Sequence, residues 1–293
     1  MKGFKYKSLA DLMSVIRNNI TKIPHDIDFV IGIPRSGMIV ASVISEMINV
    51  PLIDLDSFVK GQKPTGGHRL KLFADKKTDR VLVVDDTCYS GKAINEAKNQ
   101  LRDFKEYDFI YCIAFLEGLH PEMVDIWLDD VSNYTKKDIQ VIYEWNIFHH
   151  YPYIMLKFCF DMDGVFCTEE SRPDDRYESD YELFIKFAKP LFTPKVPIGA
   201  IVTYRITKYK DVTEYWLKEN GIVYQNLIMF NARSWQERNG SGVSPEMMKA
   251  VWYKEHPEYL LFIESNDREA QRIHEISGKQ VFCVSTNKMY GDF

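Results

Sequence analysis

The sequence predicts an α/β protein made of two domains, each built around a parallel sheet with helices on both faces. The chain has 293 residues, 45% of them hydrophobic, which suits two domains with proper cores. Short apolar strands alternate with helical segments, the pattern typical of parallel sheets. The alternation pauses at "NIFHHYPY", residues 146–153, and then restarts. We therefore expect one domain over residues 1–150 and a second over residues 151–293, each a Rossmann-like three-layer unit.

The first domain is expected to begin with a helix at Ser8, because Asp11 lies in its first turn and Pro24 ends it. A strand over 28–33 then leads into the turn "PRSG". The remaining expected elements are a helix over 38–48, a strand over 50–56, a long glycine-containing loop over 57–77, a strand over 80–86, a helix over 91–104, and strands over 109–116 and 139–145.

The second domain is expected to repeat the alternation. Its expected elements are strands over 154–163, 199–204, 226–230, 259–267 and 280–285, and helices over 208–221, 245–256 and 268–277. The segment between Asp163 and Thr203 is short, so it allows only a small insert. A site in this domain would therefore be open to a bulky substrate.

Composition excludes several classes of protein. The net charge of -5 does not favour a general nucleic-acid binder, which usually has a basic excess. The five cysteines show neither a CxxC pair nor a metal-type spacing. No secretory signal is evident and no apolar run approaches membrane-spanning length, so we expect a soluble cytoplasmic protein.

A first candidate site lies in "VLVVDDTCYSGKA", residues 81–93. Asp85 and Asp86 follow four apolar residues of a strand, at the edge where open α/β sheets bind ligands. The Ser90–Gly91 turn opens a helix, whose free N–H groups suit a phosphate. Carboxylates beside a phosphate cradle suit a sugar phosphate, since the acids accept hydrogen bonds from ribose hydroxyls.

This segment resembles the phosphoribosyl-diphosphate motif of type I phosphoribosyltransferases. The resemblance extends over about residues 1–149 and implies that Asp85 and Asp86 contact ribose hydroxyls, partly through Mg2+. The residues that it implies around the 5'-phosphate are Tyr89, Ser90, Gly91, Lys92 and Ala93. Lys92 stands where relatives often have glycine, and Ala93 where they often have threonine.

Three other segments lie at the positions in the sequence where the resemblance predicts further contacts with the substrates. The turn with Arg35, Ser36 and Gly37 is similar to the one that meets pyrophosphate. The loop over 57–77 resembles a flexible lid, although each of its basic residues also fits a solvated loop; these residues are Lys60, Lys63, His68, Arg69 and Lys71. Trp145 or Phe148 would cover an acceptor base, but packing is the favoured role for both.

A second candidate site is "FCFDMDGVFC", residues 158–167. A carboxylate at a strand end, here Asp161, can attack phosphorus and form an aspartyl phosphate. A second carboxylate, here Asp163, can protonate the leaving alcohol and then activate water. Two acids this close repel unless a cation lies between them, so Mg2+ is expected. A calcium-binding loop is the alternative interpretation.

Supporting residues follow in order. Thr203 ends an apolar strand with a hydroxyl that suits a phosphoryl group, and Lys249 lies on a helix, with Lys254 as its alternative. Another strand ends in "ESND", which offers Glu264, Ser265 and Asp267 to a metal.

The order of these motifs resembles the haloacid dehalogenase superfamily of phosphotransferases over residues 153–293. The resemblance implies Asp161 as nucleophile, Asp163 as general acid and base, and Thr203 with Lys249 as phosphate-binding residues. It also implies a metal site of Asp161, Asp163, Glu264 and Asp267. The stretch 203–222 resembles the phosphatase half of polynucleotide kinase/phosphatases, which makes Arg205 a candidate for holding substrate; a surface arginine is the alternative.

Together the motifs predict a bifunctional enzyme that uses Mg2+. One domain would transfer 5-phosphoribose from phosphoribosyl diphosphate to a small base-like acceptor, and the other would remove a phosphate, such as the 5'-phosphate of that product. Two alternatives stay open. Because Ala93 departs from the motif, the first domain is alternatively a sensor of nucleotides or phosphoribosyl diphosphate. The chain is alternatively a nucleotide or nucleic-acid-end phosphatase with a docking domain. The motifs name neither the acceptor nor the oligomeric state.

Overall fold

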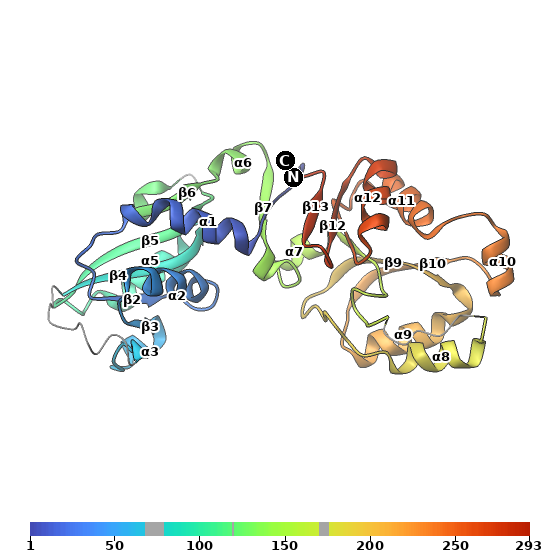
Figure 1. The fold of residues 1–293 in the computed structure, drawn as a ribbon, viewed down its shortest axis with the longest axis horizontal. Coiled ribbons are helices and arrows are strands. Elements are labelled where there is room, and N and C mark those ends of the chain that lie inside the picture. The colour runs from blue at the N-terminus through green and yellow to red at the C-terminus, as the bar shows by residue number, and fades with distance from the viewer. Residues whose placement is uncertain (68–78, 119, 170–175) are drawn as a thin grey trace. The chain divides into compact units, whose positions relative to one another are not determined.

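The computed structural model describes residues 1–67, 79–118, 120–169 and 176–293, and the chain forms two compact units (Figure 1). We call Lys7–Trp145 the first unit. The second unit comprises Asn146–Phe293 together with Met1–Tyr6. The first six residues thus group with the C-terminal half of the chain, although the sequence suggested a first domain that starts at Met1.

The first unit contains a five-stranded sheet in the order β3-β2-β4-β5-β6, and every pair in it is parallel. Its strands are β2 (Phe29–Gly32), β3 (Leu52–Asp54), β4 (Arg80–Cys88), β5 (Asp108–Leu116) and β6 (Ile126–Asp130). The helices are α1 (Leu9–Asn19), α2 (Gly37–Ile48), α3 (Leu55–Val59), α5 (Lys92–Leu101) and α6 (Ser132–Lys136). This arrangement confirms the expected parallel α/β architecture for the first half of the chain.

Helices cover both faces of this sheet because its buried strands alternate their side chains between two cores. In β4, Leu82 and Val84 pack in one core with α1 and α2. Val81 and Val83 point to the opposite core, which α3 and α5 cover. The α1 helix begins where the sequence predicted, since the Ser8 hydroxyl and the Asp11 carboxylate form a capping box.

Three elements of the first unit differ from the sequence-based expectation. The strand β6, "IWLDD", was not expected because its three apolar residues lie among acids, yet it pairs with β5. The strand expected over 139–145 is β7 (Ile139–Tyr143), which is not part of the main sheet. The expected loop after residue 56 begins with α3, because Asp54 caps that helix by accepting from the Ser57 N–H.

The second unit contains a six-stranded sheet in the order β10-β9-β8-β11-β12-β13. Its strands are β8 (Phe158–Phe160), β9 (Ile198–Ile206), β10 (Tyr224–Phe230), β11 (Leu261–Glu264), β12 (Gln280–Cys283) and β13 (Lys288–Tyr290). The helices are α7 (Pro152–Met155), α8 (Glu178–Phe187), α9 (Lys210–Glu219), α10 (Trp235–Gly240), α11 (Pro245–Glu255) and α12 (Asp267–Ser277).

This second sheet is mixed rather than purely parallel as predicted. Its last strand, β13, runs antiparallel to β12 and was not foreseen, because "KMY" is too short to carry a pattern. The strand expected over 154–163 is also shorter than predicted. Pro152 favours the first turn of a helix, so α7 occupies residues up to Met155 and the strand β8 starts at Phe158.

Helices cover both faces of the second sheet as well. Ala250 of α11 and Ile273 of α12 share a core with Val202 and Phe262 of the sheet. On the other side Tyr181 of α8 packs in a cluster with Ile206 and Tyr209. The short insert expected before Thr203 therefore contains a helix that contributes to a layer of the fold.

Residues of β1 (Gly3–Lys7) complete the core of the second unit. The Phe4 ring is fully buried and meets the Phe158 ring edge-on, with centroids 5.2 Å apart. The Gln280 side chain binds the backbone of Phe4 twice: it accepts from the N–H and donates to the C=O, each at 2.7 Å. The second unit therefore uses a segment from the opposite end of the chain.

Within the described ranges, no helix is long and apolar enough to cross a bilayer.

Candidate functional sites

The acid pair of the first unit lies within β4 and is almost fully buried, with 7% of Asp85 and 8% of Asp86 exposed. Asp85 Oδ1 accepts from the Asp86 N–H at 2.9 Å. Asp86 Oδ2 accepts from Trp145 Nε1 at 2.8 Å. Burial and the neighbouring Asp86 raise the pKa of Asp85 to about 8, and burial also raises the pKa of Asp86. Burial thus opposes a negative charge on either acid of this pair.

The "PRSG" turn lies directly against this pair. A Cβ on Gly37 would come within 2.8 Å of both Asp85 Oδ1 and the Val84 carbonyl oxygen, so only glycine fits there. Arg35 is exposed beside it and Ser36 is half-buried. The structure thus brings together the turn predicted to meet pyrophosphate and the acids predicted to meet ribose.

The predicted phosphate turn precedes α5. Gly91 has φ +73° at the N-cap of that helix, and the Lys92 N–H points to Ser90 Oγ at 3.5 Å. The side chains of Tyr89, Lys92 and Ala93 are exposed at this turn. An exposed helix N-terminus offers N–H donors and a partial positive charge, which suit a phosphate. The geometry is therefore compatible with the role that the sequence predicts for this turn.

A buried carboxyl that sequence reasoning missed follows β5. Glu117 Oε1 accepts from the Tyr143 hydroxyl at 2.7 Å, and Gln140 Nε2 lies 3.4 Å from Oε2. The Trp145 ring stacks on Tyr143, with centroids 4.7 Å apart. Trp145 therefore orients Asp86 and closes a polar network, which supports the packing role for it. Phe148 belongs to the second unit, where it stacks on Phe192.

The burial of Glu117 makes a pH-dependent prediction about stability. Burial raises its pKa to about 7 in the folded protein, against about 4.5 when unfolded. The folded state therefore holds more protons between these values, and the stability contributed by this group is lost as pH rises through 7. We expect the free energy of unfolding of the wild-type first unit to fall between pH 4.5 and pH 8 because of this carboxyl. Glu117→Gln removes the titrating group, so its free energy of unfolding should fall by about 2–3 kcal/mol less over the same pH range.

Urea unfolding at both pH values, followed by pulse proteolysis of the first unit, measures this difference. Glu106→Gln removes an exposed carboxyl and serves as the control. An equal effect of Glu117→Gln at the two pH values would show that the carboxyl is not protonated on folding.

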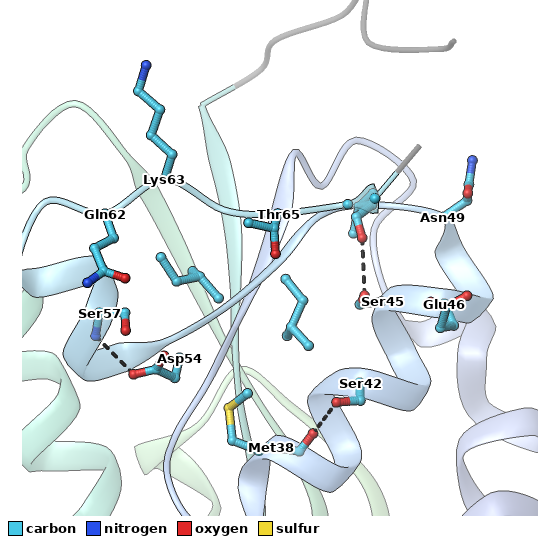
Figure 2. A pocket seen from close by; sticks show the side chains of 15 residues that line it. Met38, Ser42, Ser45, Glu46, Asn49, Asp54, Ser57, Gln62, Lys63 and Thr65 are labelled. Atoms are coloured by element: carbon cyan, nitrogen blue, oxygen red, sulfur yellow. Dashed lines mark hydrogen bonds between the residues drawn. The ribbon is translucent and has the colours of Figure 1, made fainter. Parts of the chain in front are cut away.

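The first unit also contains a cavity of about 880 Å³ beside the predicted lid (Figure 2). Figure 2 shows Ser42 and Glu46 of α2 on one side and Gln62, Lys63 and Thr65 on the segment opposite. The backbone of Thr65 pairs with Leu52 of the edge strand β3. Lys63 thus lines this cavity, and Lys60 is the exposed C-cap of α3. The other lid candidates, His68, Arg69 and Lys71, lie outside the described residues.

The second unit brings three of its predicted site residues into one buried cluster, in which Asp161 and Glu264 meet Lys249. The Lys249 Nζ donates to Asp161 Oδ2, Glu264 Oε2 and Glu269 Oε2, each at 2.8 Å. Only 2% of Lys249 is exposed, and burial by itself would lower its pKa, but the three acids outweigh that effect and raise the pKa well above the ordinary value. The other oxygen of Asp161 accepts from the Met162 N–H at 2.7 Å. Glu269, on the first turn of α12, carries no motif signal and was missed by the sequence.

Arg205 and Asp163 form the second half of this cluster. Two N–H groups of Arg205 bind the two oxygens of Asp163, at 3.1 Å and 2.5 Å. The arginine is fully buried and also reaches the Thr213 hydroxyl and the Cys167 sulfur, each at 3.3 Å. Its contacts therefore point inward, so the alternative of a surface arginine is wrong.

The other predicted site residues of this unit are Thr203, Glu264 and Asp267, and they differ in whether their side chains belong to the cluster. Thr203 Oγ1 is buried and accepts from the Arg205 N–H at 3.3 Å. Glu264 is held by backbone N–H groups of Ser265 and Asn266, which bind its Oε1. The carboxylate of Asp267 instead accepts from the hydroxyls of Thr286 and Tyr290. The structure therefore places Glu264 in the cluster and gives Asp267 partners on other segments.

The loop between the two aspartates is held tightly. Gly164 has φ +75°, and a Cβ there would come within 2.3 Å of the Ser265 hydroxyl. That hydroxyl donates to the Asp163 carbonyl oxygen at 3.1 Å. The DxDG turn is thus packed against the end of β11, which fixes Asp161 and Asp163 relative to Glu264.

Negative charge exceeds positive charge in this cluster. Four acids, Asp161, Asp163, Glu264 and Glu269, face the two cations Lys249 and Arg205. Burial is the main cause that raises the pKa of Asp161 to about 7, with Glu264 and Asp163 adding to it and Lys249 opposing it. Among the described residues, no three or more His, Cys, Asp or Glu side chains are placed as a metal-binding group.

Comparisons with known proteins concern the first half of the chain. Residues 5–146 match the family model of the phosphoribosyl transferase domain. A purine phosphoribosyltransferase from Pyrococcus horikoshii Ot3 is 20% identical, with a TM-score of 0.36, over 50% of this chain and 94% of that chain. A xanthine-guanine-hypoxanthine phosphoribosyltransferase from Helicobacter pylori is 14% identical, with a TM-score of 0.36, over 49% of this chain and 94% of the other.

An orotate phosphoribosyltransferase from Aeropyrum pernix is 18% identical, with a TM-score of 0.32, over 44% of this chain and 74% of that one. The search of curated proteins gave no match. Residues 5–146 are thus similar to the phosphoribosyl transferase domain by their match to its family model.

Proposed function

We propose that the first unit, which carries the match to the phosphoribosyl transferase domain, transfers 5-phosphoribose from phosphoribosyl diphosphate to a base-like acceptor. The second unit hydrolyses a phosphomonoester through an aspartyl phosphate. In this proposal its substrate is the 5'-phosphate of the product of the first unit. The chain would then install a phosphorylated ribose and afterwards remove the phosphate.

In the first unit, the observation that supports transfer is the contact of the "PRSG" turn with the buried acid pair. Asp85 and Asp86 would accept hydrogen bonds from the two ribose hydroxyls. The N–H groups at the start of α5 would hold the 5'-phosphate. Arg35 would lie beside the departing pyrophosphate and offset its negative charge. An acceptor nitrogen then forms a bond to the ribose carbon, while the bond between that carbon and the pyrophosphate oxygen breaks.

In the second unit, the observation that carries the proposal is the placement of Asp161 between Lys249 and the Met162 N–H. Both contacts favour the ionised carboxylate and oppose the burial that raises its pKa to about 7. The ionised form attacks phosphorus while the bond to the leaving alcohol breaks. Asp163 gives that alcohol a proton and later takes one from the water that cleaves the aspartyl phosphate. Thr203 and Lys249 would bind the phosphoryl oxygens during both steps.

Arg205 positions Asp163 in this mechanism. Its two hydrogen bonds fix the Asp163 carboxylate in one orientation, and its full burial keeps it away from bulk solvent. An arginine bound in this way holds the acid and base group rather than the substrate itself.

We also propose Mg2+ as the cofactor of the second unit. The donor set consists of carboxylate oxygens that outnumber the neighbouring cations, a chemistry that suits a hard divalent ion. Asp161 and Glu264, which meet at Lys249, would hold it. The other two predicted ligands fit this position less well, because Arg205 binds both oxygens of Asp163 and Asp267 has partners on other segments. Bound there, Mg2+ would neutralise charge on the transferred phosphoryl group.

The complete proposal is tested by incubating the full-length Asp161→Asn protein with phosphoribosyl diphosphate and a metabolite extract. Since this variant cannot remove the phosphate, we expect an acceptor to gain one phosphoribosyl group, detected by mass spectrometry. A variant with Asp85→Asn and Asp86→Asn in addition should form none of this product. It should also bind phosphoribosyl diphosphate at least about tenfold more weakly in calorimetry, the loss of roughly one charge-assisted contact.

The outcomes separate this proposal from its alternatives. Tight binding of phosphoribosyl diphosphate without any phosphoribosylated product or released pyrophosphate would favour the sensor interpretation. Unchanged affinity in the Asp85→Asn, Asp86→Asn protein would refute the first site.

A further inference from the structure

The outer side of the helix α8 carries large apolar side chains that face solvent. Tyr181 and Ile185 are fully buried in the cluster beneath the helix, together with Ile206 of the sheet. Leu183 and Phe187 are instead 56% and 71% exposed. Because successive residues of a helix turn by about 100°, these two pairs lie on opposite sides of α8. A surface helix needs one apolar side, so the second is not explained by the fold of a single chain.

The neighbouring helix α9 extends this apolar side. The two helices lie side by side on one face of the second sheet (Figure 1). Tyr215 of α9 is 47% exposed. The Lys186 Nζ lies 5.6 Å from the centroid of the Phe187 ring and 5.7 Å from the centroid of the Tyr215 ring. Both rings therefore adjoin the same ammonium group, and the exposed apolar side chains of α8 and α9 belong to one surface.

This surface also carries one acid and one base whose charges do not meet. Glu182 and Lys186 are exposed on α8 and four positions apart, a spacing at which opposite charges often pair. Within the part of the chain that the structure describes, the Lys186 ammonium contacts the two rings and no carboxylate, and Glu182 takes part in no ion pair. Both charges thus stay available to another molecule. We call Glu182, Leu183, Lys186, Phe187 and Tyr215 the α8 surface.

The order of these charges along α8 makes the surface complementary to itself. In a two-fold dimer each copy presents the same patch, so a patch binds itself only if its charges match on reversal. Glu182 lies one turn before Lys186, so two antiparallel α8 helices bring the acid of each copy to the lysine of the other. Leu183 and Phe187 would pack between the two helices, since apolar side chains inside a polar rim are typical of interfaces. A partner with charge of a single sign would match only one of the two charged side chains, so the charges favour a second copy.

We propose that the α8 surface binds the same surface of a second copy of this chain and forms an antiparallel two-fold dimer. The inference goes beyond the proposed function, since neither the transfer of phosphoribose nor the release of phosphate enters it. The apolar side chains involved are few, which places the contact among small, reversible interfaces. We expect a dissociation constant in the micromolar range, so the chain is monomeric at nanomolar concentration.

Sedimentation velocity of the full-length protein, from nanomolar to high micromolar concentration, measures this association. The wild-type chain should pass from monomer to dimer over that range. Leu183→Ser removes an apolar side chain from the contact and should raise the dissociation constant by at least about tenfold. Val223→Ser is the matched control, because Val223 is 58% exposed in the same unit, ahead of β10, and lies outside the α8 surface. This control should leave the dissociation constant unchanged.

Two charge reversals test the geometry of the dimer. Glu182→Lys and Lys186→Glu each place like charges opposite one another in both halves of a symmetric dimer, and each should raise the dissociation constant by at least about tenfold. An equimolar mixture of the two variants should regain the wild-type value. In the mixed dimer the introduced lysine meets the introduced glutamate, and the native Lys186 meets the native Glu182. Glu255→Lys makes the same change of net charge at an exposed position of α11 and should not weaken the association.

Recovery of association in the mixture supports the α8 surface and its antiparallel pairing together, because unfolding of either variant would prevent it. A wild-type chain that stays monomeric throughout the range would overturn the inference. So would a dimer that Leu183→Ser and both charge reversals leave unchanged, since it would form through another surface. Weakened variants without recovery in the mixture would reject the pairing of Glu182 with Lys186. Binding of the monomeric chain to phosphatidylglycerol vesicles, lost with Leu183→Ser, would assign the surface to a membrane instead of a second copy.

Discussion

Replacing Asp161 with asparagine is expected to lower phosphate release from phosphomonoesters by about 10³-fold or more, as removal of a nucleophile does in other enzymes. The amide has nearly the same shape as the carboxylate and still accepts from the Met162 N–H, so the fold should be retained. It lacks the negative charge that attacks phosphorus and that pairs with Lys249. A malachite-green assay with p-nitrophenyl phosphate as the substrate measures the loss.

Two controls make this result specific. Asp211→Asn changes an exposed aspartate on α9 of the same unit and should release phosphate at the wild-type rate. Binding of phosphoribosyl diphosphate to the Asp161→Asn protein should be unchanged, because Asp85 and Asp86 belong to the first unit. Phosphate release by Asp161→Asn at the wild-type rate would reject the assignment of the second site.

Replacing Phe4 with alanine is expected to destabilise the second unit by about 3–5 kcal/mol, the usual cost of removing a buried phenylalanine ring. The ring is fully buried against Phe158, and the backbone of Phe4 is bound on both sides by Gln280. Removal of the ring would leave a cavity beside Phe158 in the core of the second unit. Pulse proteolysis in urea, which follows cleavage within the second unit, measures its free energy of unfolding.

Phe187→Ala is the matched control, since 71% of Phe187 is exposed on α8 and little area is lost on truncation. A chain that begins at residue 7 should show a still larger loss, because it lacks both the ring and the two hydrogen bonds to Gln280. If Phe4→Ala leaves the unfolding free energy of the second unit within about 0.5 kcal/mol of wild type, the segment is not part of that core.

The parallel architecture of the first unit could be predicted because it depends on local patterns. Four consecutive apolar residues before Asp85 predict a strand buried on both faces, and the structure divides them between two helical layers. The helix α1 was predicted equally well, since its capping box lies within four residues of sequence. The strand β6 was not, because pairing with β5 stabilises an acid-rich segment that has little strand character of its own.

The residues of the candidate sites also divide into those that local sequence patterns indicate and those that depend on tertiary contacts. Asp85, Asp161 and Glu264 could be proposed from sequence because each lies at or near the end of a strand. Glu117 and Glu269 were missed because their importance comes from partners distant in sequence, Tyr143 and Lys249 respectively. The inward orientation of Arg205 likewise depends on Asp163, which lies 42 positions away along the chain.

The sequence by itself therefore determined the alternation of strands and helices and the chemical types of the acids that follow the strands, because both are encoded over a few neighbouring residues. Only the tertiary structure decided which charges meet. Burial removes water from Asp161, Asp163, Lys249 and Arg205. The electrostatic energies of these charged groups therefore depend on the few groups within contact distance. The same holds for Phe4, which completes the second unit because the folded chain brings its first residues to Phe158 and Gln280.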